Sequence, residues 1–178
     1  MELKEMEKEI DRERLLEIGK VRGKKILDVG VGELTKIAVE KFDCKVICID
    51  MDIEAIKRAV EENRSYVRDG KIKFENYDAS NLPYKDFSFD ICISWCALHH
   101  TPVEKRENFI KELFRVAKEK IIIADFTESG FPHSDDEYKI VNLKWLERKL
   151  KKIGKVEKFT DGKIELYICY KQISQEEK

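Results

Sequence analysis

Residues Ile26–Gly32 read ILDVGVG, an apolar run that contains one acid and ends in two glycines. A short apolar run of this kind, directly after Lys24 and Lys25, predicts a buried strand of a parallel sheet. The glycines let the backbone turn sharply and approach a ligand without an intervening side chain. A strand, a glycine turn and a helix N-terminus leave backbone N–H groups pointing into a crevice. The stretch therefore predicts a nucleotide-sized binding site.

Strand-like and helix-like segments alternate after this stretch. Strands are predicted over 24–30, 44–50, 71–77, 89–95 and 121–126, with helices over 34–42, after Asp52, over 101–118 and over 134–154. Such alternation predicts a parallel sheet with right-handed crossovers and helices on both faces. Asp161-Gly162 lies between two further strand-like runs and predicts a closing antiparallel hairpin.

The fold class predicted is α/β: a doubly wound, mostly parallel seven-stranded sheet with helices on both faces and a C-terminal hairpin. A chain of 178 residues suits one domain of this kind, over 1–178. Within it we expect an amphipathic N-terminal helix over 1–20, a ligand-binding core over 24–126, and the last helix with the hairpin over 134–171.

Several segments carry specific predictions of helix ends. Thr101–Glu104 reads as a capping box with proline at the first helical position. Asp52 is expected to cap a helix whose inner face carries Ile53, Ile56 and Val60. Ser134–Glu137 would begin the last helix and Gly154 would end it.

Composition argues against several functions. Charged residues make up 40% of the chain, yet the net charge is −1 and no basic stripe occurs, so strong nucleic-acid binding is not expected. No apolar stretch is long enough for a membrane span, and the charged start Met1–Glu5 is unlike a signal peptide, so we expect a cytoplasmic protein. None of the five cysteines forms a Cys-x-x-Cys pair, so no metal site is expected.

The ends of the predicted strands carry the residues suited to a binding crevice. In a doubly wound sheet, ligands bind at the carboxyl ends of the strands. The first strand ends in Asp28 and the glycines, and the second ends in Asp50, where a carboxylate can accept hydrogen bonds from ribose hydroxyls. Asp78 and Ala79 follow the third strand, and Trp95 ends the fourth.

Taken in order, these motifs resemble the class I methyltransferases that use S-adenosylmethionine, above all the small-molecule branch that includes quinone-biosynthesis methyltransferases. The resemblance rests on Leu27–Gly32, Asp50, Asp78-Ala79 before Leu82-Pro83-Tyr84, Phe89-Asp90, and Ala97–His100. It covers residues 24–126, and the C-terminal hairpin fits the same fold. It implies S-adenosylmethionine as the cofactor and a small molecule as the methyl acceptor.

The resemblance also implies roles for individual residues. Gly30 and Gly32 would pass beneath the methionine part of the cofactor, and Asp28 would help to hold its amino group. Asp50 would accept from the ribose hydroxyls, with Met51 against the adenine face.

For the adenine base, the resemblance implies that Asp78 accepts from the amino group and that the Ala79 N–H donates to the ring. Trp95 would bring backbone close to the methionine moiety. Structural explanations stay open beside these roles: Asp28 and Asp78 can cap turns, Asp50 can cap the helix that Asp52 otherwise begins, and Trp95 can simply pack.

One position departs from the family pattern. Leu34 stands where a third glycine is usual, which predicts a shortened turn and an altered pocket around the methionine tail. This departure favours an alternative function, a non-catalytic partner subunit or binding module with the same fold. A third interpretation keeps the fold and binds a different nucleotide.

Two adjacent histidines are the candidate catalytic bases. His99 and His100 follow the fourth predicted strand, and His133 in the loop after the fifth could lean over the substrate. Methyl transfer from a sulfonium needs a base only for a weakly acidic acceptor. Little of the chain remains to shape an acceptor site, so a homodimer or partner subunit could complete it.

Overall fold

A computed structural model of the chain describes residues 4–5, 8–132 and 139–172. Within these ranges eight strands form one sheet in the order β1-β7-β8-β6-β5-β2-β3-β4. The strands are β1 Lys4–Glu5, β2 Lys25–Val29, β3 Lys45–Asp50, β4 Ile72–Asn76, β5 Phe89–Trp95, β6 Ala117–Phe126, β7 Lys155–Thr160 and β8 Ile164–Tyr170. The helices are α1 Arg12–Ile18, α2 Glu33–Phe42, α3 Ile53–Glu62, α4 Arg64–Arg68, α5 Arg106–Val116 and α6 Leu143–Ile153, with 3-10 turns η1 Leu98–His100 and η2 Val103–Lys105.

The pairing of the strands confirms the predicted fold class. β2 pairs in parallel with β3 and β5, β3 with β4, and β5 with β6. β8 is antiparallel to both β6 and β7, which gives the predicted hairpin. The sheet has one strand more than the predicted seven, because the two-residue β1 pairs in parallel with β7 at the edge.

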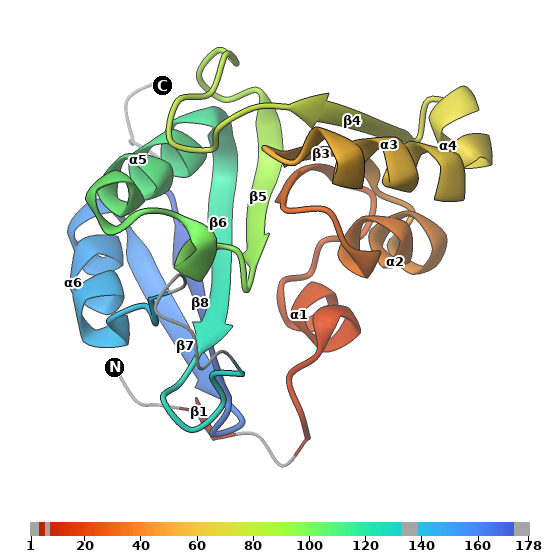
Figure 1. The fold of residues 1–178 in the computed structure, drawn as a ribbon. Helices are drawn as coiled ribbons and strands as arrows, with labels where there is room; N and C mark the ends of the chain where they lie inside the picture. Colours follow the sequence, from red (N-terminus) through yellow and green to blue (C-terminus); the bar gives the residue numbers. More distant parts are fainter. Residues whose placement is uncertain (1–3, 6–7, 133–138, 173–178) are drawn as a thin grey trace, which may run out of the picture.

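Two hydrophobic cores lie on the two faces of the sheet, because neighbouring residues of a strand point to opposite faces. Leu27 packs with Leu113 of α5 and Leu150 of α6 in one core. Ile26 packs with Leu15 of α1 and with side chains of α2 in the second core. Figure 1 shows α5 and α6 on one side of the sheet and α1 and α2 on the other.

The N-terminal helix is shorter than the predicted 1–20. It begins at Arg12, where the Asp11 side chain caps it by accepting from Arg14 N at 2.7 Å, and the Lys4–Glu5 segment is a strand instead. The Ile10 N–H donates to Asp161 Oδ2 at 2.7 Å. This bond ties the segment before the helix to the hairpin turn.

The predicted capping box is wrong. Thr101 makes no side-chain cap, Val103–Lys105 forms a 3-10 turn, and the α-helix begins only at Arg106. The Arg106 side chain bonds the Thr101 backbone carbonyl at 3.0 Å and so holds this stretch in a different conformation. On α3, Asp52 caps as predicted by accepting from the backbone N–H groups of the first turn, but Ile53 is 49% exposed rather than inward.

The last helix also begins later than predicted. α6 starts at Leu143, capped by Asn142 Oδ1, which accepts from Trp145 N at 2.9 Å. The predicted start at Ser134–Glu137 lies outside the described residues. Gly154 follows the last turn as predicted.

Candidate functional site

A cavity of about 610 Å³ opens at the carboxyl ends of the central strands. Its walls come from the loops that follow β2, β3, β4 and β5, with further side chains from α1 and η2. Of the predicted site residues, nine line it: Asp28, Gly30, Gly32, Asp50, Met51, Asp78, Ala79, Trp95 and His100. His99 is not in the lining. The separate strand-end motifs therefore meet in one place.

The glycine turn joins β2 to α2 beneath this cavity. Gly30 has φ +97°, a left-handed conformation that favours glycine, and its N–H donates to Ile49 O at 2.8 Å. Gly32 is the N-cap of α2 and supplies no side-chain cap. The first N–H groups of the helix are thus available to an acceptor in the cavity.

No loop intervenes between this turn and the helix. α2 begins at Glu33, directly after Gly32, and the Leu34 side chain is buried in the core while also lining the cavity. Leu34 thus forms part of the cavity wall, and the helix follows the glycine turn directly.

Asp28 is buried at the end of β2, where it is 1% exposed. The Thr35 hydroxyl donates to its Oδ2 at 2.6 Å. Burial raises the pKa of Asp28 to about 7, although the Thr35 hydrogen bond and the nearby Arg12 act in the opposite direction. No sequence motif predicts this contact between Thr35 and Asp28.

Asp50 connects the two loops that flank the cavity. Its Oδ2 accepts from Val31 N and its Oδ1 accepts from Asp52 N, both at 2.8 Å. Asp50 therefore does not cap α3, since Asp52 does, but it holds the two loops together. Each of its carboxylate oxygens has a second lone pair for a ligand. Met51 beside it is 67% exposed.

Asp78 lines the cavity after β4 and belongs to a hydrogen-bond network. Its Oδ1 accepts from both the backbone N–H and the hydroxyl of Ser80, and its Oδ2 accepts from Lys105 Nζ at 2.9 Å. Burial acts to raise the pKa of Asp78, but the hydrogen bonds from Lys105 and Ser80 outweigh it and the pKa is lowered. The carboxylate is charged at neutral pH.

The two candidate bases occupy different positions. His100 lines the cavity, whereas His99 lies behind it, with its Nδ1 3.0 Å from Asp125 Oδ1. The two rings are 4.1 Å apart between centroids, and Phe126 contacts the His99 ring edge-on. The structure thus brings only His100 to the place where an acceptor could bind. The third candidate, His133, lies outside the described residues.

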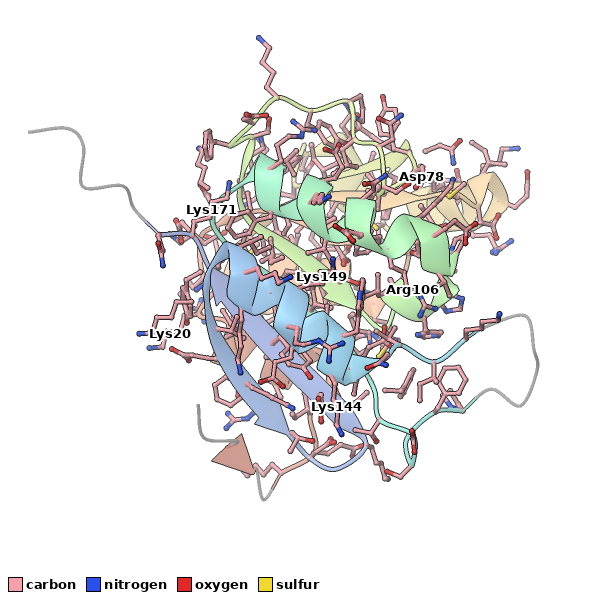
Figure 2. All side chains as sticks on the ribbon, turned by 90° about the vertical axis from the view of Figure 1, so that its left-hand side faces the viewer. Lys20, Asp78, Arg106, Lys144, Lys149 and Lys171 are labelled. Atoms are coloured by element: carbon pink, nitrogen blue, oxygen red, sulfur yellow. The ribbon has the colours of Figure 1, made fainter. Side chains whose placement is uncertain are left out.

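Two arginines near the site were missed by sequence reasoning. Arg12 of α1 lines the cavity, with its guanidinium carbon 5.6 Å from the centroid of the Trp95 ring. Arg106 of α5 is 4% exposed and donates to the backbone carbonyls of Thr101, His99, Lys139 and Ile140. Figure 2 shows Arg106 where α5 meets the segment that leads to α6. No sequence motif distinguishes these arginines from the many other charged residues.

The described part of the chain contains no helix with both the length and the apolar character needed to cross a membrane. Within the same residues, no group of three or more His, Cys, Asp or Glu side chains is arranged to hold a metal ion.

A mostly parallel sheet with an antiparallel final strand, and a cavity of this composition at its carboxyl edge, define a class I S-adenosylmethionine-dependent methyltransferase fold. The chain belongs to the methyltransferase domain family, whose family model matches residues 26–120. The match runs from β2 into the start of β6, the part of the chain that builds most of the cavity.

The chain is also similar to individual curated proteins. The chain is 33% identical to an uncharacterized protein of Haemophilus influenzae over 97 residues, which is 53% of this chain and 39% of that protein. It is 30% identical to ajmaline N-methyltransferase of Rauvolfia serpentina over 133 residues, 72% of this chain and 44% of that enzyme. The chain spans less than half the length of these curated relatives.

Solved structures show the same fold. A protein from Pyrococcus horikoshii OT3 superposes with a TM-score of 0.72 at 20% identity, covering 90% of each chain. A SAM-dependent methyltransferase from Aquifex aeolicus superposes with a TM-score of 0.69 at 20% identity, covering 90% of this chain and 89% of the other.

Proposed function

We propose that this protein transfers a methyl group from S-adenosylmethionine to a small-molecule acceptor. The observation that carries the proposal is the convergence of Asp28, Asp50 and Asp78 on one cavity beside a glycine turn. These acids follow three different strands, and all lie at the carboxyl edge where such sheets bind ligands.

The methionine part of S-adenosylmethionine fits the groups at one end of the cavity. This part carries an ammonium and a carboxylate. Asp28 would accept from the ammonium, and the Arg12 guanidinium and the uncapped N-terminus of α2 would hold the carboxylate. The Arg12 side chain has no hydrogen-bond acceptor among the described residues, so its donors are available.

The adenosine part fits the groups at the other end. Asp50 is held in position by two backbone N–H groups and retains lone pairs for the ribose hydroxyls. The exposed Met51 thioether would pack against the base. Asp78 and the Ala79 N–H would bond its edge.

The chain would contribute mainly orientation to the reaction. When bound, the cofactor supplies an electrophilic methyl group on a sulfonium. Alignment of the reacting groups can contribute about 7–11 kcal/mol. His100 lies in the cavity wall and would accept a proton from an acceptor hydroxyl or ammonium. His99, held by Asp125, would act as a positioning residue behind it.

The names of the curated relatives support a small organic acceptor. They include norajmaline N-methyltransferase of Rauvolfia serpentina and 27-O-demethylrifamycin SV methyltransferase of Amycolatopsis mediterranei. Both names describe transfer to a small molecule, one at nitrogen and one at oxygen. In this chain the acceptor would meet the wall formed by Trp95, Cys96, His100 and Phe126.

Isothermal titration tests the proposal directly. We expect the wild-type chain to bind S-adenosylmethionine and S-adenosylhomocysteine, and Asp50→Ala to lose most of that binding. Asp69→Asn, an exposed acid in the turn before β4, is the matched control and should bind normally. Absence of heat with wild-type protein at millimolar ligand would contradict the proposal.

The alternative of a non-catalytic partner subunit makes a different prediction. It expects stable co-purification of a larger partner and no methyl transfer to any component of a cell extract. Transfer of a radiolabelled methyl group to an extract component by the isolated chain, abolished in Asp50→Ala, would exclude that alternative.

A further inference from the structure

We propose that Lys105 forms a second recognition group for the adenine base, acting together with Asp78. This inference rests on the proposed function, because it concerns the adenosine end of the same cavity. Lys105 belongs to η2, after β5, whereas Asp78 follows β4. The two side chains thus reach the cavity from different segments of the chain.

The geometry of the pair carries the inference. Lys105 Nζ lies 2.9 Å from Asp78 Oδ2, and both residues line the cavity. Their side chains are 46% and 27% exposed, so water and ligand can both reach them. An ion pair this exposed contributes little to the stability of the fold, so stability does not explain why it lies in the cavity wall.

The remaining hydrogen-bonding capacity of the pair has a definite pattern. Asp78 Oδ1 already accepts two hydrogen bonds, both from Ser80, so its lone pairs are filled. Oδ2 accepts one, from Lys105, and retains one lone pair. The ammonium of Lys105 has three N–H groups and donates one of them to Asp78, which leaves two. The pair therefore offers one acceptor beside a charged donor.

Adenine offers the complementary pattern. Along one edge, its N6 amino group donates next to N7, which accepts. Asp78 would accept from N6, and Lys105 would donate to N7, while the Ala79 N–H remains for the opposite side of the ring. A base with a carbonyl oxygen in place of the amino group would present an acceptor to Asp78 and would be rejected.

Titration with two ligands tests this assignment. The probes are S-adenosylhomocysteine and its 7-deaza analogue, in which N7 is replaced by C–H. The variants are Lys105→Met and, as control, Lys111→Met, which removes an exposed lysine paired with Glu107 on α5. We expect wild-type and Lys111→Met protein to bind the 7-deaza analogue about tenfold more weakly, as for one charge-assisted hydrogen bond.

Lys105→Met should bind S-adenosylhomocysteine about tenfold more weakly than wild type and should no longer distinguish the two ligands. Binding of S-adenosylhomocysteine by Lys105→Met that is equal to or tighter than that of wild type would overturn the inference. Lys105 would then either contribute nothing to binding or compete with the ligand for Asp78. Equal binding of both ligands by wild-type protein would also overturn it, without reference to any variant. If wild-type protein bound neither ligand, the proposed function itself would fail, and this inference with it.

Discussion

Replacement of Asp28 by asparagine should stabilise the protein, and the gain should grow with pH. Asp28 is 1% exposed, and burial raises its pKa from 3.8 to about 7. The folded state thus favours the neutral acid, while the unfolded chain ionises at lower pH. The stabilisation that the neutral form provides is complete below pH 3.8 and is lost as the pH rises through about 7. Asparagine is neutral throughout and keeps an acceptor for the Thr35 hydroxyl.

The size of the effect follows from the two pKa values. Each unit of difference corresponds to about 1.4 kcal/mol. An isolated group titrating between them lowers the free energy of unfolding by about 1.5 kcal/mol at pH 5 and about 4 kcal/mol at pH 8. The gain from Asp28→Asn should therefore increase by about 2.5 kcal/mol between these two pH values.

Urea unfolding of wild type and Asp28→Asn at pH 5 and pH 8 measures this difference, because the titration of all other groups is common to both proteins. Asp69→Asn, an exposed acid, serves as control and should show no such change. A gain that is the same at both pH values, or a loss of stability at pH 8, would refute the reasoning. If Asp28 also binds the ligand ammonium, the stabilised variant should bind S-adenosylhomocysteine more weakly than wild type.

Two further predictions concern the glycine turn beneath the cavity and the buried side chain of Arg106. Gly30→Ala places a side chain at φ +97° and should lower the free energy of unfolding, measured by urea titration, by about 1–2 kcal/mol. Gly32→Ala, at φ −178° and with no atom within 4 Å of the added Cβ, should leave the free energy of unfolding nearly unchanged. Equal effects of the two substitutions would contradict this prediction. Arg106→Met removes the donor from four backbone carbonyls and should lower the free energy of unfolding by about 3 kcal/mol, measured in the same way. A loss below about 1 kcal/mol would show that water replaces the guanidinium.

The central part of the fold was predictable because its signals are local. Each central strand of the sheet is a short apolar run between polar turns, and α2 and α3 follow with the expected spacing. The ends of the chain gave weaker signals. The strand Lys4–Glu5 is charged and two residues long, and it exists because β7 offers a free edge that its own sequence does not reveal. The capping box at Thr101 failed because the side chain of Arg106, five residues further on, bonds the Thr101 carbonyl and holds that backbone.

The acids of the site were predictable for a topological reason. Residues at the ends of parallel strands meet at one edge of the sheet, so Asp28, Asp50 and Asp78 could be placed together from the sequence alone. The basic residues of the site could not be predicted in this way. Arg12 and Lys105 reach the cavity from a helix and a 3-10 turn, and only the packing of these elements decides which of many basic residues points inward.

The positions of Asp28 and Arg12 explain why a destabilising acid is buried here. In the chain alone, Asp28 lies in a poorly solvated position near Asp50, and Arg12 offsets that only in part. An amino-acid tail carries an ammonium and a carboxylate, the two charges that complement this pair. An ammonium beside Asp28 would lower its pKa and recover the free energy lost through burial. Ligand binding at neutral pH should then release protons, which calorimetric titration in buffers of different ionisation enthalpy detects. Proton release that is absent in wild type, or unchanged in Asp28→Asn, would show that Asp28 does not bind the ligand ammonium.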